Sequence, residues 1–247
     1  MQKTNSKYLY PALISFLFLG SFYLFSSIRY PLLNSDNAVT VLMTHYFKFP
    51  NDLYFWGQDR LGSLIPLIGQ IPNKLFGMSP ILSESITHYL ILLAGFLAFS
   101  TFIRSKFYKV IFAIIWFFPP MHLIDVTQFA FGIHYSLIAI VCYLIDKLNK
   151  ENSYDNPIRY YSILTLCSLL LVVAVWVSDM AMVSAGLLIG ISIYYFIKNK
   201  NQVNSRNRNS FIVFSLIGSV VGYLFISYAK SLSTMQNSYS TFGEIDM

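Results

Sequence analysis

Charged residues are scarce in this 247-residue chain. Asp, Glu, Lys and Arg make up 11% of it, whereas hydrophobic residues make up 55% and aromatic residues 17%. Soluble globular domains carry roughly 25% charged residues, so the composition excludes an ordinary soluble domain. At about 20 residues for each transmembrane helix plus connecting loops, the length fits about six to eight membrane spans.

Cysteine is almost absent as well. Cys142 and Cys167 both fall inside apolar segments, which excludes a disulfide framework and a zinc site. The chain also lacks a Gly-rich phosphate loop ahead of a helix, and it has no Ser-His-Asp or Cys-His set. The net charge of +6 comes from basic residues between apolar segments. Such residues are signals of membrane topology, so no nucleic-acid partner is expected.

The apolar segments predict an all-α fold, a multi-pass transmembrane helical bundle formed by a single domain over residues 1–247. About seven spans are expected, over residues 8–28, 81–103, 108–121, 129–145, 162–178, 180–197 and 211–229. With the N-terminus in the cytoplasm, twelve of the seventeen Lys and Arg residues fall in inner segments. The positive-inside rule therefore predicts a cytoplasmic N-terminus and an outer C-terminus.

The first outer loop, residues 29–79, is the one long polar and aromatic insert. Its apolar residues between positions 39 and 47 recur at helical spacing, which predicts a short helix after Asp36. This helix is too short and too mixed to cross a bilayer, so we expect it to lie in the interface plane. Residues 62–76 predict a second interfacial piece, broken by Pro66 and Pro72.

Asp36 is the first candidate for chemistry. A carboxylate at the membrane surface can act as a general base that takes a proton from an acceptor hydroxyl or amine. The alternative is structural, because Asp36 or Ser35 would serve well as the N-cap of the helix that follows. The two roles are compatible, and the residues alone leave both open.

The same outer loop carries cations in its interior, where few are expected. Lys48, Arg60 and Lys74 can recognise a phosphate or an anionic lipid head group, and the planar fork of Arg60 suits phosphate oxygens best. Ordinary interfacial solvation, or a salt bridge with Asp52 or Asp59, is the favoured alternative for the two lysines and applies less to Arg60.

Further polar residues are candidates for lining a cavity at the outer face. His122 and Asp125 are three apart and would share a helix face, where they could hold a divalent cation together with Asp36. Polar groups at the interface are the favoured explanation, so no metal or other cofactor is expected. Asp179 is expected in a tight turn, capping the sixth span, with lining of the cavity as an additional role.

The first outer loop contains two stretches that resemble a known family. They read Asn34-Ser35-Asp36-Asn37-Ala38-Val39 and Tyr54-Phe55-Trp56-Gly57-Gln58-Asp59-Arg60-Leu61-Gly62-Ser63-Leu64. The pattern is similar to the GT-C superfamily of membrane glycosyltransferases, above all to the bacterial branch of protein O-mannosyltransferases and the aminoarabinose transferase of lipid A. In that family an acid follows the first span, and a juxtamembrane helix and an aromatic-Gly-Gln-x-x-Gly-Ser-like stretch come next.

The resemblance implies an inverting transfer of a hexose or pentose from a polyprenyl-phosphate-linked donor, on the outer face of the bacterial inner membrane. Asp36 matches the family's base, while Arg60 and Gln58 fall in the stretch that lies near the donor. Trp176 and Asp179 also resemble the family's pattern at the start of the sixth span.

Two departures modify this expectation. Many relatives carry an acidic pair where this chain has Asp36-Asn37, and relatives are commonly longer, with further spans. The chain is therefore expected to be an N-terminal part or a truncated form, with a partner chain supplying the missing spans. The alternatives are an inactive module that binds a lipid-linked sugar or a partner subunit, and a transporter or flippase. The gathering of ionisable groups at the outer face, rather than at mid-membrane, argues against transport.

Overall fold

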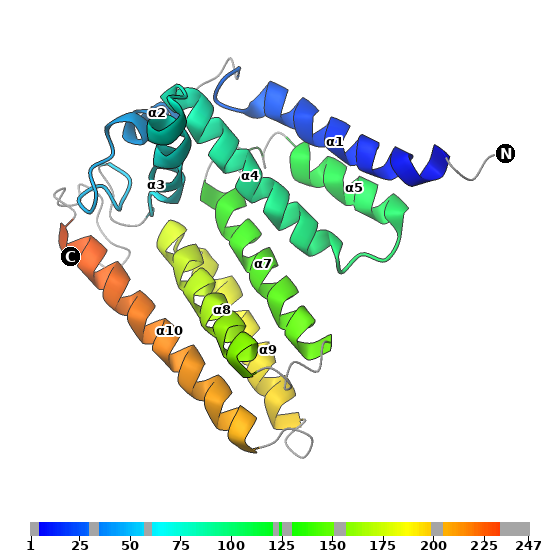
Figure 1. Cartoon of the computed structure of the whole chain (residues 1–247), viewed down its shortest axis with the longest axis vertical. Coiled ribbons are helices and arrows are strands. Elements are labelled where there is room, and N and C mark those ends of the chain that lie inside the picture. The colour runs from blue at the N-terminus through cyan, green and yellow to red at the C-terminus, as the bar shows by residue number, and fades with distance from the viewer. Residues whose placement is uncertain are drawn as a thin grey trace, which may run out of the picture.

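The computed structural model describes residues 5–29, 35–56, 61–120, 124, 130–150, 157–198 and 205–232. These residues form helices joined by loops and contain no strand, so the predicted all-α class is confirmed. The helices are α1 (Asn5–Phe25), α2 (Ser35–Tyr46), α3 (Leu64–Gln70), the π-helix η1 (Ile71–Leu75), α4 (Pro80–Ser100), α5 (Lys106–Phe117), α7 (Ala130–Lys150), α8 (Pro157–Val177), α9 (Ala181–Lys198) and α10 (Ser205–Leu232) (Figure 1).

Three helices are long and apolar enough to cross a bilayer, which indicates a membrane protein. They comprise Tyr8–Phe25 in α1, Pro80–Ser100, which is the whole of α4, and Ile158–Val177 in α8. Helices also occupy the other four predicted span ranges, but α5 has only 12 residues. At 1.5 Å per residue it is about 18 Å long, less than the ~30 Å hydrocarbon core. Crossing by all seven helices, and the orientation, stay predictions.

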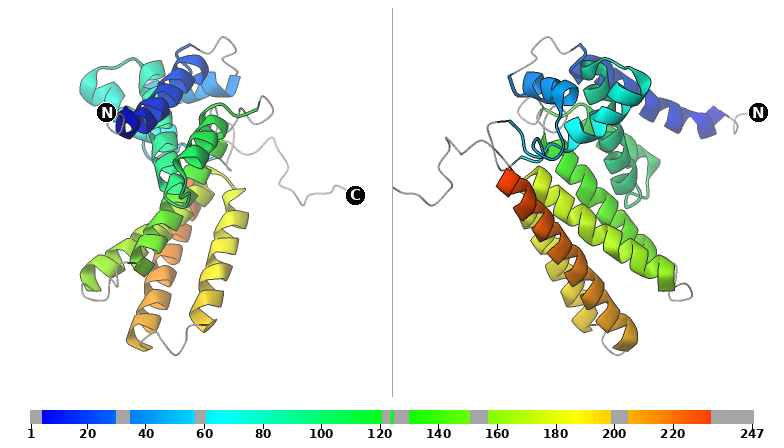
Figure 2. Two further views of the ribbon diagram at one scale, coloured as in Figure 1. Left: turned by 90° about the vertical axis from the view of Figure 1, so that its right-hand side faces the viewer. Right: turned by 60° about the vertical axis from the view of Figure 1, so that its left-hand side comes forward.

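The long helices form two groups that meet along α4 and α7. In Figure 1, α1 and α5 lie beside α4, while α8 lies between α7 and α10. The short helices α2 and α3 pack against each other and against α4, near the end toward which α10 runs (Figure 2). The short helices of residues 35–75 therefore sit at one end of the helical bundle.

Buried hydrogen bonds join the first group of helices. The Tyr89 hydroxyl of α4 donates to the backbone carbonyl of Ser21 in α1 at 2.9 Å, and the Ser21 hydroxyl donates to the carbonyl of Phe117 in α5 at 2.6 Å. Around these bonds lies an apolar cluster of Ile14, Leu92, Phe96, Ala113, Trp116 and Phe117. Van der Waals packing and such bonds are what hold helices together where lipid removes the hydrophobic driving force.

Small residues allow the second group to pack closely. Gly95 of α4 lies against Ser136 of α7, and Gly222 of α10 lies against Val172 of α8, in each case with no room for a Cβ atom. Close approach of helix backbones at glycine and other small residues is the usual packing mode within membranes.

The prediction that Pro66 breaks the second interfacial piece is wrong. Pro66 is the third residue of α3, in its first turn, where the backbone N–H has no intrahelical partner and proline is tolerated. The regular α-helix ends instead at Gln70, and the π-helix η1 begins there with Pro72 as its second residue. Only the second proline marks a change in helix geometry.

Candidate functional site

Residues 53–56 and 61–63, here called the docked loop, fold back on themselves and attach to the bundle. The Phe55 N–H donates to the Leu61 carbonyl at 2.8 Å, and the Ser63 N–H donates to the Leu53 carbonyl at 3.1 Å. The Gly62 N–H donates to the carbonyl of Trp176 at 2.8 Å, in the last turn of α8. The described parts of the second family-like stretch, residues 54–56 and 61–64, are thus held at the end of α8.

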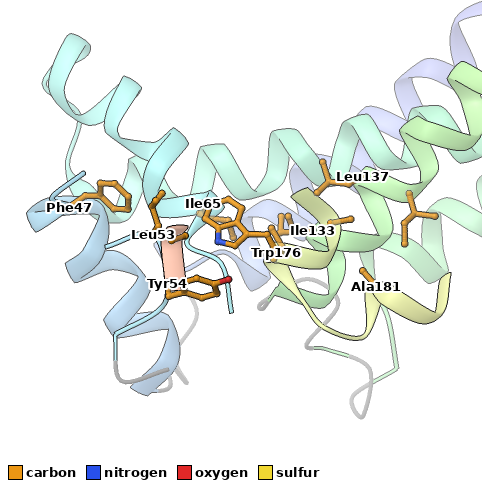
Figure 3. Packing of buried hydrophobic residues seen from close by; sticks show 12 residues of the cluster. Phe47, Leu53, Tyr54, Ile65, Ile133, Leu137, Trp176 and Ala181 are labelled. Atoms are coloured by element: carbon orange, nitrogen blue, oxygen red, sulfur yellow. The ribbon is translucent and has the colours of Figure 1, made fainter. Parts of the chain in front are cut away.

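The docked loop packs against the side chain of Trp176. This side chain is 3% exposed and belongs to a cluster with Leu53, Ile65 and Ile133, which Figure 3 shows around the indole ring. A Cβ atom on Gly62 would lie 2.6 Å from ring atoms of Trp176. Glycine at this position is therefore required by the close approach of backbone to ring.

Asp52 holds the start of the same loop. Its carboxylate accepts the backbone N–H of Lys48 at 2.7 Å and the indole N–H of Trp56 at 3.0 Å. The predicted alternative was a salt bridge between the side chains of Lys48 and Asp52. The structure instead shows a hydrogen bond from the Lys48 backbone N–H to the Asp52 carboxylate. The side chains of Lys48 and Lys74 are exposed.

Asp36 lies in the first turn of α2, and its side chain is half-buried. It stands inside the helix rather than at the N-cap position. A negative charge in the first turn of a helix still complements the helix dipole. Its backbone carbonyl accepts the hydroxyl of Thr40 at 2.9 Å. Asp36 is therefore a first-turn residue and not an N-cap, and its carboxylate lies at the N-terminal end of α2.

A small cavity of about 30 Å³ lies between the docked loop and the helices. Its polar lining comes from Thr40 of α2, Ser63 of the docked loop and Glu84 of α4, while Ile133 of α7 and Val177 of α8 contribute apolar walls. A cavity needs about 10–15 Å³ to hold one water molecule, so this one admits a water-sized occupant. Residues of the second family-like stretch line it together with Thr40, which directly follows the first stretch.

Glu84, which lines this cavity, and its neighbour His88 form a buried pair that sequence reasoning missed. Both are buried in α4, with the Nδ1 atom of His88 3.8 Å from a carboxylate oxygen of Glu84, and the Ser85 hydroxyl donates to the other oxygen at 3.2 Å. The signal was available, because a Glu and a His four residues apart within an apolar helix share one face. Ionisable groups inside such helices are costly and usually functional.

The remaining predicted site residues divide into two sets. Asp179 is exposed in the turn of residues 178–180 between α8 and α9, where its carbonyl accepts the N–H of Met182 at 3.0 Å. The near absence of a loop there is as predicted. Gln58, Arg60, His122 and Asp125 lie outside the described residues, and among the described ones no three His, Cys, Asp or Glu side chains gather into a metal-binding group.

No family model matches the chain, and no curated protein or solved structure matches it. Any functional assignment therefore rests on the chain's own residues and their geometry.

Proposed function

We propose that the protein is a membrane glycosyltransferase module that moves a sugar from a polyprenyl-phosphate-linked donor to an acceptor at the outer face. One observation supports this most directly. Thr40, one helical turn after Asp36, lines the same cavity as Phe55, Leu61 and Ser63. The helix that carries Asp36 and the second family-like stretch, although separated in sequence, therefore border one cavity.

In this proposal Asp36 is the general base. The acceptor hydroxyl oxygen forms a bond to the anomeric carbon of the sugar while the Asp36 carboxylate takes its proton. The bond between that carbon and the phosphate oxygen breaks, and the polyprenyl phosphate leaves with the electron pair. Arg60 is the proposed partner of the phosphate, because its guanidinium can pair with two phosphate oxygens at once.

A second candidate is a non-catalytic module that binds a lipid-linked sugar or a partner chain. The size of the cavity favours it, since about 30 Å³ is far below the roughly 300–1,000 Å³ of typical ligand pockets. In this alternative a partner chain with further spans completes the donor pocket, and Asp36 has only its role in the first turn of α2.

The test is sugar transfer by the full chain in liposomes that contain a polyprenyl-phosphate-linked hexose or pentose. The Asp36→Asn variant should lose transfer by about 10²–10⁴-fold, the usual contribution of a general base, with unchanged unfolding behaviour. Asp146→Asn, in α7, is the matched control and should keep its activity. Transfer that persists in Asp36→Asn rejects the proposed base, whereas donor binding by the wild type without any transfer supports the non-catalytic candidate.

A further inference from the structure

Glu84 is a buried carboxylate without a cationic partner of fixed charge. Its side chain is 3% exposed, and the one ion pair that it forms among the described residues is with His88, at 3.8 Å. That distance is too long for a hydrogen bond. The Ser85 hydroxyl supplies a single neutral bond. Because a carboxylate removed from water is unfavourable unless it is paired, the site calls for a positive charge.

Two residues with hydroxyl groups, Thr40 and Ser63, line the cavity together with Glu84. The Ser63 side chain is 2% exposed, and its hydroxyl has no hydrogen-bond partner among the described residues. The Thr40 hydroxyl donates its proton to the carbonyl of Asp36, so its lone pairs remain able to accept. Three residues with oxygen-bearing side chains, from α2, the docked loop and α4, therefore line one cavity of about 30 Å³.

We propose that this cavity binds a monovalent cation of sodium size. One carboxylate and two neutral hydroxyls balance a single positive charge. Calcium and magnesium carry two positive charges, which the single carboxylate of Glu84 would leave half uncompensated, and magnesium also retains several waters that this small space does not hold. Transition metals prefer nitrogen and sulfur ligands, and the polar lining here offers oxygen only. The volume is sufficient for the ion and about one water molecule.

A bound ion would hold three separate parts of the chain together. Thr40 lies in the helix that carries Asp36, Ser63 ends the docked loop, and Glu84 belongs to the long helix α4. Sodium should therefore stabilise the folded protein and order the docked loop. This inference is independent of sugar transfer, because it makes no use of the Asp36 carboxylate.

The experiment is thermal unfolding of the full chain in detergent micelles, with sodium chloride exchanged for choline chloride or potassium chloride at constant ionic strength. Sodium should raise the melting temperature saturably, by about 3–6 °C at ten times its dissociation constant. Binding of radioactive sodium should saturate at one ion per chain. Equal melting temperatures in sodium, potassium and choline would overturn the proposal.

Three variants locate the site. Glu84→Gln keeps the size of the side chain and should lose both sodium binding and the sodium-dependent shift. In choline it should be at least as stable as the wild type, which a merely structural role for Glu84 does not predict. Ser63→Ala should raise by about tenfold the sodium concentration that gives half of the rise in melting temperature. This variant tests the site if Glu84→Gln fails to fold. Asp146→Asn should behave as the wild type. A sodium shift that survives in both cavity variants contradicts the assignment.

Discussion

The backbone N–H of Gly62 donates to the carbonyl oxygen of Trp176 across 2.8 Å, and the indole ring of Trp176 lies against the same glycine. The last carbonyl groups of a helix have no intrahelical donor, so the docked loop supplies one to the end of α8. This contact connects the outer-loop insert to the second group of long helices. The position of the candidate site therefore depends on a pair of residues far apart in the chain.

Replacing Gly62 by alanine should disrupt this docking. The new Cβ atom would lie 2.6 Å from the Trp176 ring, so the loop or the ring must shift. We expect Gly62→Ala to lower the free energy of unfolding by about 1–3 kcal/mol, as overpacking of buried sites usually does. Chemical unfolding in detergent, followed by tryptophan fluorescence, measures the change.

Gly186→Ala is the matched control for that substitution. A Cβ atom at Gly186, in α9, meets no atom within 4 Å. This variant should be as stable as the wild type or slightly more stable, because alanine favours a helix over glycine by about 1 kcal/mol. Equal losses of stability in both glycine variants would show that Trp176 does not restrict position 62.

Removing the Asp52 carboxylate should loosen the start of the docked loop. Asp52→Ala loses the bonds from the Lys48 backbone N–H and from the Trp56 indole. The local opening free energy should fall by about 1–2 kcal/mol, and hydrogen exchange at the Lys48 amide should accelerate accordingly. Lys48→Ala keeps the backbone donor, so exchange at that amide should stay near the wild-type rate. Fast exchange in both variants would mean that the lysine ammonium matters after all.

The predicted topology can be tested by cysteine accessibility in intact cells. In a background with Cys142 and Cys167 replaced by alanine, Ser35→Cys should react with a membrane-impermeant maleimide, since position 35 follows the first span. Ser105→Cys, between Arg104 and Lys106, should react only after permeabilisation, because basic segments remain in the cytoplasm. Both side chains are exposed. The reverse pattern of labelling would place Asp36 on the cytoplasmic side and would exclude the proposed sugar transfer at the outer face.

Much of the helical framework could be predicted from local sequence. Long apolar runs favour helices because a backbone in lipid must satisfy its own hydrogen bonds, and the helices α1, α4 and α8 follow from this alone. The amphipathic spacing after Asp36 likewise predicts α2. The effect of Pro66 was misjudged, because a proline in the first turn of a helix is tolerated whereas one in the interior is not.

The amino-acid sequence by itself determined the class of this protein, since its apolar runs, scarce charge and basic connectors depend only on neighbouring residues. Tertiary structure alone decided that Gly62 meets Trp176, and that Thr40, Ser63 and Glu84 border one cavity. The physical reason is desolvation. A carboxylate such as Glu84 becomes buried and needs a cation only when helices distant in the chain close around it.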